Sequence, residues 1–243
     1  DSIALEKAGV MRPFKTCIYA QEKPPSALLK YAKNKSVNLL IHNNDYRVNL
    51  GSSNWSLKSK NNSINEIPNL KMIGDYQYNY AAASLLALDA LLPECLEDHD
   101  VIKKALSETE ISGRFQYLSK SPDIILDVAH NEDAAKSLSD NIKKLGYDKI
   151  IVVLGVLADK DVYSIVEPFS SLVDHWYIGT INSERGMNSD EIKFRINSIY
   201  KNKLSIGTYA SVTSAFNAAK YDQTKDSLLP VSYTHLTLPT IHR

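Results

Sequence analysis

The sequence predicts an α/β protein whose C-terminal half contains a Rossmann-like, mostly parallel sheet. After residue 113, short apolar stretches that suit strands alternate with longer stretches of helical periodicity, the order that a parallel sheet requires. One of the apolar stretches, Lys149–Leu154, is a continuous β-branched run that suits a strand buried on both faces. A polar cluster at Asp127–Asn131 separates a strand from a helix, which is where open α/β sheets bind ligands.

The amino-acid composition indicates an ordinary globular protein. The 243 residues are enough for one large domain or two small ones, and 44% hydrophobic with 23% charged residues is ordinary for a globular protein. Lys plus Arg and Asp plus Glu are both 28, so the charge indicates neither a nucleic acid nor a membrane surface as partner. No apolar run approaches the roughly 20 residues of a membrane-spanning helix. Cys17 and Cys95 lack metal-ligand spacing and favour free thiols in the cytoplasm.

The first half of the chain is predicted to contain helices, short strands and an irregular region. Residues 1–10 indicate the end of a helix, with Gly9 as its C-cap. The clearest helix is Gln77–Leu92, because its apolar residues repeat at helical spacing. The other expected elements are a strand at Lys15–Tyr19, a helix opened by Pro24 and Pro25, a strand at Val37–His42, strands and turns of a sheet edge at Asp45–Lys71, a short helix at Val101–Leu106 and a linker at Thr109–Ser112.

The second half follows a strand–helix alternation. A strand at Asp123–Leu126 precedes the polar cluster, and Asn131 is a good N-cap for a helix running towards Leu145. The remaining elements are a strand at Lys149–Leu154, a helix begun by Asp159-Lys160-Asp161, a strand at His175–Gly179, a helix at about Ser189–Tyr200, a strand at Leu204–Thr208 and a helix at Ser211–Ala219. The polar cluster also has a purely structural interpretation, in which Asp127 ends a strand, Asn131 caps a helix and His130 is an ordinary loop histidine.

Several sequence motifs resemble those of a known family, which periodicity alone does not indicate. The two strings Ser112-Gly113-Arg114-Phe115-Gln116 and Ser121-Pro122-Asp123-Ile124-Ile125-Leu126-Asp127-Val128-Ala129-His130-Asn131 resemble the start of the C-terminal domain in the folylpolyglutamate synthase/dihydrofolate synthase family. That family belongs to the Mur ligase superfamily of ATP-dependent amide ligases. Further stretches resemble the family at Glu6-Lys7-Ala8-Gly9, at Gly155 with Asp159-Lys160-Asp161, and at Ser183-Glu184-Arg185-Gly186. Gly74–Asn79 matches less well, because Tyr76 stands where His is common and Asn79 lies one place early.

The resemblance implies a domain organisation. Residues 1–112 would be the C-terminal part of the family's central ATP-binding domain, and residues 113–229 the C-terminal α/β (glutamate ligase) domain. No phosphate-binding Gly-x-x-x-x-Gly-Lys-Ser/Thr loop occurs, and the chain starts at Asp1 without Met, so we expect a fragment that is inactive alone. Pro230–Arg243 resembles translated adapter sequence, which predicts a non-native tail and a sheet that lacks its last strand.

The resemblance also implies a mechanism and a set of site residues. ATP and Mg²⁺ would activate the carboxylate of dihydropteroate or a folate as an acyl phosphate, which the amino group of L-glutamate attacks. Arg114 would contact phosphate, Asp127 would bind the ribose and Asn79 would contact the nucleotide. Alternatively, Asn79 only occupies the first turn of its helix and has a structural role. His130 would meet glutamate or the acyl phosphate, and Lys7, as a carbamate, would bind Mg²⁺.

Two alternative functions remain compatible with the residues. A related Mur-type ligase would join an amino acid to a cell-wall precursor, although the C-terminal motifs of such ligases differ from the strings at residues 113–116 and 127–131. A non-catalytic α/β module would only bind a nucleotide or a partner, which the missing phosphate loop favours. The expected enzyme is a cytoplasmic monomer whose partners are small-molecule substrates.

Overall fold

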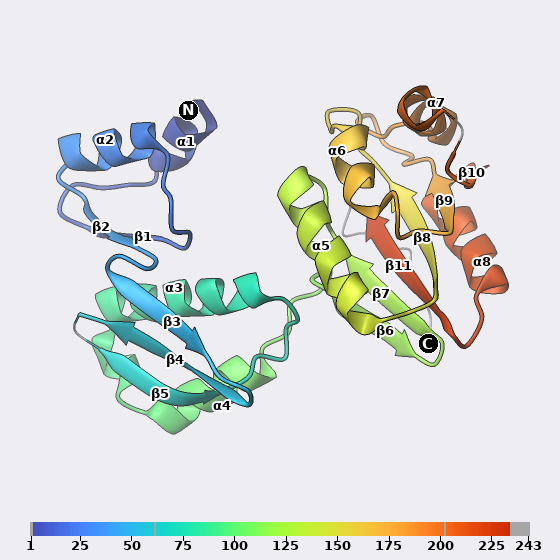
Figure 1. Cartoon of the computed structure of the whole chain (residues 1–243). Helices are drawn as coiled ribbons and strands as arrows, with labels where there is room; N and C mark the ends of the chain where they lie inside the picture. Colours follow the sequence, from blue (N-terminus) through green and yellow to red (C-terminus); the bar gives the residue numbers. More distant parts are fainter. Residues whose placement is uncertain (1, 61, 202, 234–243) are drawn as a thin grey trace. The chain divides into compact units, whose positions relative to one another are not determined.

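The computed structural model describes residues 2–60, 62–201 and 203–233, and the chain forms two compact units, residues 1–110 and 111–243 (Figure 1). The boundary falls within the segment Thr109–Ser112, where the sequence pattern changes. Within the described residues, no helix combines the length and the apolar character needed to cross a bilayer.

The first unit contains a small parallel sheet and a separate antiparallel sheet. Its elements are α1 (Ser2–Ala8), β1 (Thr16–Tyr19), α2 (Ser26–Asn34), β2 (Asn38–Ile41), β3 (Tyr46–Leu50), β4 (Asn54–Ser59), β5 (Ser63–Pro68), α3 (Asp75–Leu91), a 3₁₀ turn (Pro93–Leu96) and α4 (His99–Glu108). Strands β1 and β2 are parallel, and β3, β4 and β5 form an antiparallel meander. The strands and turns expected at Asp45–Lys71 are present, but they form a sheet of their own rather than the edge of a larger sheet.

The core of this unit lies between the meander and α3. Trp55 and Ile67 from the sheet and Ala82 and Leu85 from α3 are almost fully buried. Alternation along β4 places Trp55 and Leu57 on the same inner face, as the two-residue period of a strand requires. Helix α3 therefore owes its stability to one apolar face that packs on the sheet.

The second unit is a six-stranded sheet with helices on both faces. Its elements are β6 (Gln116–Lys120), β7 (Asp123–Asp127), α5 (Glu132–Leu145), β8 (Lys149–Gly155), α6 (Val162–Val166) with a 3₁₀ turn (Glu167–Phe169), β9 (His175–Gly179), α7 (Ser189–Tyr200), β10 (Ile206–Tyr209), α8 (Val212–Asp222) and β11 (Ser227–Tyr233). The strand order is β10-β9-β8-β11-β7-β6, and only β6 is antiparallel to its neighbour. The predicted α/β class with a mostly parallel sheet is confirmed.

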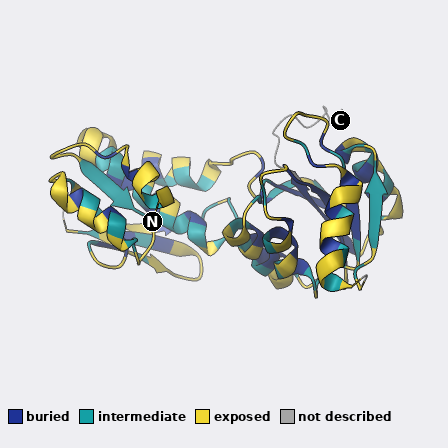
Figure 2. Ribbon diagram, turned by 90° about the horizontal axis from the view of Figure 1, so that it is seen from above, coloured by how far each residue is buried: buried dark blue, intermediate teal, exposed yellow. Residues whose placement is uncertain are grey.

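Burial on both faces explains the apolar strands of this sheet. On one face, Ile124, Val153 and Tyr177 pack with Val212 and Ala215 of α8. The intervening residues of the strands are buried on the opposite face, where α5 and α6 lie against each other. Figure 2 shows these strands as dark blue ribbons between helices with exposed outer faces.

The last strand corrects one expectation. The resemblance predicts a sheet without this strand, but β11 lies in its centre, between β7 and β8. Leu228, Leu229 and Val231 supply buried apolar side chains. Residues 230–233 of the expected tail are therefore part of the sheet, whereas residues 234–243 lie outside the described residues. The strand expected at Leu204–Thr208 also begins later, at Ile206.

Candidate functional site

The candidate site lies at the carboxyl edge of the sheet in the second unit. Strands β7, β8 and β9 end at Asp127, Gly155 and Gly179, and the loops that follow carry the polar side chains singled out in the sequence. Because these strands are parallel, their carboxyl ends share one edge. Strand β11 separates β7 from β8, so the loops after these two strands leave the sheet one strand apart.

Asp127 holds the turn formed by the Gly113–Gln116 motif. Its side chain is 6% exposed, and Oδ2 accepts a hydrogen bond from the backbone N–H of Phe115 at 2.8 Å. Phe115 has φ +46°, a left-handed conformation that is unfavourable for a bulky residue. Gly113, at φ +74°, can adopt this region without a Cβ clash, and its carbonyl accepts from the N–H of Val128 at 2.9 Å. The motif is thus folded back onto the end of β7.

The surroundings of Asp127 act on its ionisation in opposite directions. Burial raises the pKa of Asp127, whereas the N–H of Phe115, the charge of Arg114, the N–H of Ala129 and His130 each lower it. Arg114 is exposed, so its guanidinium is open to solvent while it lies near a buried carboxylate. A fixed planar cation in this position is suited to bind phosphate oxygens.

His130 is oriented by the loop that carries it. Its Nδ1 lies 2.8 Å from the carbonyl oxygen of Val128, and the ring is half-buried. A carbonyl only accepts, so Nδ1 carries the proton of this hydrogen bond. In the neutral ring Nε2 is then an acceptor, which is the tautomer required of a group that takes a proton from an amine.

Asn131 has the structural role that the sequence indicates. Its side-chain oxygen accepts from the N–H of Ala134 at 2.9 Å and caps α5. Glu132 and Asp133 occupy the first turn of the same helix. Two carboxylates at that position interact favourably with the positive end of the helix dipole.

A second polar cluster joins the loops after β8 and β9. Asp159 lies 2.8 Å from the guanidinium of Arg185 and 2.9 Å from the ammonium of Lys160. Backbone contacts hold the same two loops together. The N–H of Ala158 donates to the carbonyl of Arg185 at 2.8 Å, and Leu157 and Gly186 form an isolated antiparallel β-bridge. Both loops carry motifs that resemble the family, yet no local pattern indicates that they meet, because 26 residues separate Asp159 from Arg185. Asp161 caps α6 through the N–H of Tyr163.

The Asp159 cluster gives a pH-dependent stability. The two cations lower the pKa of Asp159 from 3.8 to about 2, so the stabilisation is present above about pH 4 and is lost as the pH falls towards 2. We expect Asp159→Asn to lower the melting temperature at pH 7 by a small amount, and this difference from wild type to shrink as the pH falls from about 4 to 2. The measurement is a melting curve at each pH, with the exposed Asp148→Asn as control. A difference that stays constant across this range would contradict the role of the ion pairs.

The first unit holds the other two predicted site residues. Lys7 is the last but one residue of α1, and its ammonium donates to Glu6 at 3.1 Å with both side chains 73% exposed. Asn79 is half-buried in α3, which begins at Asp75, so Asn79 lies in the second turn rather than the first. Both interpretations of Asn79, as a nucleotide contact and as a structural residue, stay predictions.

A Mg²⁺ site is not complete in the described part of the chain. The ammonium of Lys7 has no lone pair for a metal ion, and a carbamate would be needed to supply oxygen ligands. Among the described residues, no three His, Cys, Asp or Glu side chains converge in a way that could hold a metal ion. A carbamate on Lys7 would add oxygen atoms of the kind that Mg²⁺ prefers.

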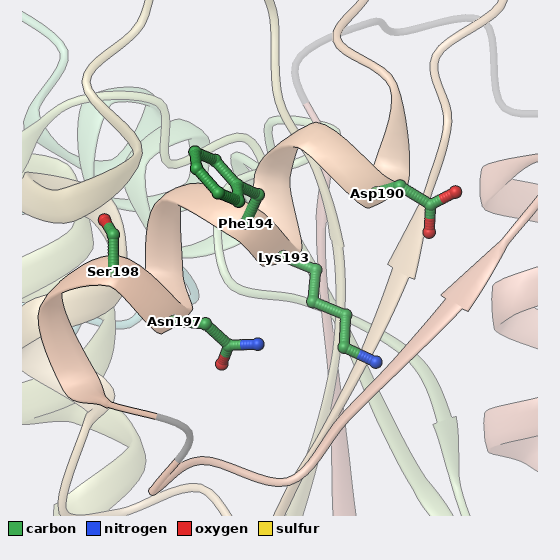
Figure 3. A pocket seen from close by; sticks show the side chains of 5 residues that line it. All are labelled: Asp190, Lys193, Phe194, Asn197 and Ser198. Atoms are coloured by element: carbon green, nitrogen blue, oxygen red, sulfur yellow. The ribbon is translucent and has the colours of Figure 1, made fainter.

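A shallow depression on α7 lies apart from these residues. Asp190, Lys193, Phe194, Asn197 and Ser198 line it, all from one helix, with the ring of Phe194 73% exposed (Figure 3). Because its lining comes from a single helix, groups from two elements do not converge on a ligand there. The carboxyl edge of the sheet remains the candidate site.

Known proteins that resemble this chain place these features in a family. The family described as "Mur ligase, glutamate ligase domain" matches residues 113–231. The dihydrofolate synthase/folylpolyglutamate synthase of Escherichia coli (strain K12) is 29% identical over 237 residues, which cover 97% of this chain and 53% of that protein. A protein of the same name from Buchnera aphidicola subsp. Baizongia pistaciae is 33% identical over 197 residues, covering 79% of this chain and 44% of that protein.

This chain belongs to the dihydrofolate synthase/folylpolyglutamate synthase family. The predicted membership of the Mur ligase superfamily is thereby confirmed. A solved structure of E. coli FolC in complex with DHPP and ADP has a TM-score of 0.83 at 28% identity, over 95% of this chain and 53% of that chain. A bifunctional folylpolyglutamate synthase/dihydrofolate synthase with Mn, AMPPNP and L-glutamate bound also has a TM-score of 0.83, at 25% identity over 96% of this chain and 54% of that chain. The chain thus spans about half the length of the curated relatives it matches.

Proposed function

We propose that this chain is part of an ATP-dependent ligase that adds L-glutamate to dihydropteroate, to folates or to both. The observation that carries the proposal is the similarity to dihydrofolate synthase/folylpolyglutamate synthases over 97% of the chain. The geometry of the Gly113–Gln116 turn on Asp127 supports it, because the motif that resembles the family also forms the site.

The reaction proceeds in two steps. A carboxylate oxygen of the pteroate or folate attacks the γ-phosphorus of ATP, the bond to the β-phosphate oxygen breaks, and ADP leaves. The amino nitrogen of glutamate then attacks the acyl carbon, the carbon–oxygen bond to phosphate breaks, and the amine loses its proton. Both steps need neutralisation of phosphate charge and exclusion of water, which would otherwise hydrolyse the acyl phosphate.

Residues of the second unit have distinct roles in this scheme. Arg114 contacts phosphate oxygens through its exposed guanidinium, and Asp127 accepts hydrogen bonds from the ribose hydroxyls. His130 meets the glutamate amine or the acyl phosphate, and its Nε2 can accept the proton that the amine loses, because Nδ1 already donates to Val128.

Residues of the first unit contribute the remaining proposed contacts. Asn79 contacts the nucleotide, and Lys7, once carbamylated, is a ligand of the Mg²⁺ that would neutralise phosphate charge. Residues 1–112 then form the C-terminal part of a central ATP-binding domain, and residues 113–229 the glutamate ligase domain. We further propose that the complete enzyme acts as a cytoplasmic monomer.

The proposal is tested with a full-length enzyme that contains this chain. We expect ADP release that requires both L-glutamate and a pteroate or folate acceptor, with one ADP formed for each amide. Dihydropteroate and a reduced folate, supplied separately, distinguish the two acceptor classes. ADP release that is independent of either substrate, or dependent on a cell-wall precursor instead, would contradict the assignment.

A further inference from the structure

The backbone on both sides of Arg114 is held by side-chain acceptors. The N–H of Gly113 donates to Oε1 of Gln116 at 3.0 Å. The N–H of Phe115 donates to Oδ2 of Asp127 at 2.8 Å. Asp127 already has a proposed role in ATP binding, whereas the reaction scheme gives Gln116 none. Gln116 is therefore a polar side chain of the site that holds the turn but has no proposed function.

Arg114 lies exposed between two buried residues with a left-handed backbone. Gly113 has φ +74° and Phe115 has φ +46°. The ring of Phe115 contacts the ring of Tyr117 edge to face, with centroids 6.2 Å apart, and this contact anchors the residue that follows Arg114. Gly113 has no side chain to anchor it, so its conformation depends on the hydrogen bonds of its own peptide groups.

Two hydrogen bonds hold Gly113, and Gln116 provides one of them. The carbonyl of Gly113 accepts from the N–H of Val128 at 2.9 Å, and its N–H donates to Gln116. Gln116 is the first residue of β6 and pairs with Leu126 of β7, so its main chain is fixed in the sheet (Figure 1). Loss of this acceptor would let the glycine adopt other conformations, and the direction of Arg114 would vary with them.

We propose that Gln116 is a positioning residue of the ligase reaction, whose side chain fixes the turn that directs the guanidinium of Arg114 towards the phosphate groups of ATP. This inference rests on the proposed function and deepens it, because it accounts for how an exposed arginine is preorganised. An unanchored turn would allow Arg114 many directions, and ordering it on a phosphate would then cost more conformational entropy. Gln116 itself does not touch the ligand, so its whole effect passes through Arg114.

A double-mutant cycle in a full-length enzyme containing this chain tests the proposal. Gln116→Met keeps the length of the side chain but removes its strong acceptor, and it is expected to lower kcat/KM for ATP roughly fivefold, the effect of one hydrogen bond between neutral groups. Arg114→Ala should lower kcat/KM by more than about tenfold. Adding Gln116→Met to Arg114→Ala should cause no further loss. Gln116→Asn, one methylene too short to reach Gly113, is the second variant and should behave like Gln116→Met.

Hydrogen exchange and a matched glutamine separate positioning from a general loss of structure. The amide proton of Gly113 should exchange faster in Gln116→Met than in the wild type, and at the wild-type rate in Gln116→Glu, because a carboxylate can accept the same hydrogen bond. The matched control is Gln223→Met at the amino edge of the sheet, where the Gln223 side chain donates to the carbonyl of Asp123 at 2.8 Å. This control should lower the melting temperature and leave kcat/KM for ATP unchanged.

The possible outcomes distinguish a failure of this inference from a failure of the proposed function. Unchanged kcat/KM for ATP in Gln116→Met and Gln116→Asn would overturn the positioning role and leave the proposed function intact. Additive losses in the double variant would also overturn it, because Gln116 would then act independently of Arg114. Equal losses of activity in Gln116→Met and Gln223→Met would show a structural role only. A wild-type enzyme whose ADP release does not depend on glutamate would overturn the proposed function instead.

Discussion

Replacing Asp127 by alanine is expected to impair both the stability of the second unit and the binding of ATP. The N–H of Phe115 would be left buried without its acceptor, at a cost of about 1–3 kcal/mol in the free energy of unfolding. Loss of the proposed ribose contact would raise the KM for ATP roughly tenfold or more, because a hydrogen bond to a charged group contributes about 1.5–3 kcal/mol. The KM for glutamate should change little, which is the signature of a contact made before chemistry begins.

Asp127→Asn separates these two effects. The amide oxygen can still accept from Phe115, so most of the stability should return, whereas the charged acceptor for the ribose is lost. We expect a melting temperature near wild type with a raised ATP KM. Wild-type ATP KM in both variants would end the ribose assignment and leave Asp127 as a structural residue that holds the turn.

His130→Ala provides the contrast within the same loop. Its loss should lower kcat or raise the KM for glutamate roughly tenfold, with ATP affinity nearly unchanged, because in the proposed scheme His130 acts after ATP is bound. Steady-state kinetics with ATP and glutamate varied separately, together with a melting curve, distinguish the variants. Equal losses in stability and in all kinetic constants for His130→Ala and Asp127→Asn would indicate that both residues only brace the loop.

Gly186→Ala should be among the most destabilising substitutions in the second unit. A Cβ on Gly186 would lie 1.8 Å from the carbonyl oxygen of Ile181 and 2.7 Å from its carbonyl carbon, and backbone atoms cannot move aside as a side chain can. We expect a loss of about 3 kcal/mol or more in the free energy of unfolding, at the upper end of overpacking effects. The shift would also displace the neighbouring Arg185 from Asp159.

Gly207→Ala is the matched control for this prediction. It lies in the same sheet, but the nearest atoms to its Cβ would be side-chain atoms of Tyr209 and His175 at 3.1–3.3 Å. These side chains can move by a few tenths of an ångström, so we expect a change below about 1 kcal/mol. Denaturant unfolding of both variants gives the comparison, and equal destabilisation would show that the contact with Ile181 is not the cause.

Local patterns predict the elements of the second unit well, because each signal lies within its own segment. The β-branched run at Lys149–Leu154 corresponds to β8, and Asn131 caps α5 as its position before an apolar periodicity indicates. Whether each element is a helix or a strand follows from the period of its apolar side chains and from its capping residues. Both signals lie within one or two helical turns.

The arrangement of the sheet could not be predicted in the same way. Strand β11 lies between β7 and β8, which are adjacent in the sequence, so its place depends on pairing across about a hundred residues. Pro230 also disfavours a central strand, because proline cannot donate to a ladder. In the structure Pro230 is paired with Ile125 of β7, and the register of β11 with β8 is the same on both sides of it, with Leu228 opposite Ile150 and Val231 opposite Val153.

For the same reason, only part of the candidate site could be predicted from the sequence. The motif around Asp127 indicates the loop that forms the candidate site, yet the hydrogen bond to Phe115 depends on a left-handed residue that no propensity predicts. The contact of Asp159 with Arg185 joins two motifs that are independent in the sequence. In both cases the missing information is a tertiary contact that overrides local preference.

The most direct test of the proposed mechanism follows one oxygen atom through the reaction. A full-length enzyme containing this chain is supplied with ATP, L-glutamate and dihydropteroate whose carboxylate carries ¹⁸O. If the carboxylate is activated as an acyl phosphate, one labelled oxygen leaves with phosphate for each amide formed, and mass spectrometry of the inorganic phosphate will show one ¹⁸O per molecule. Unlabelled phosphate accompanying amide formation would contradict acyl phosphate activation and, with it, the proposed ligase mechanism.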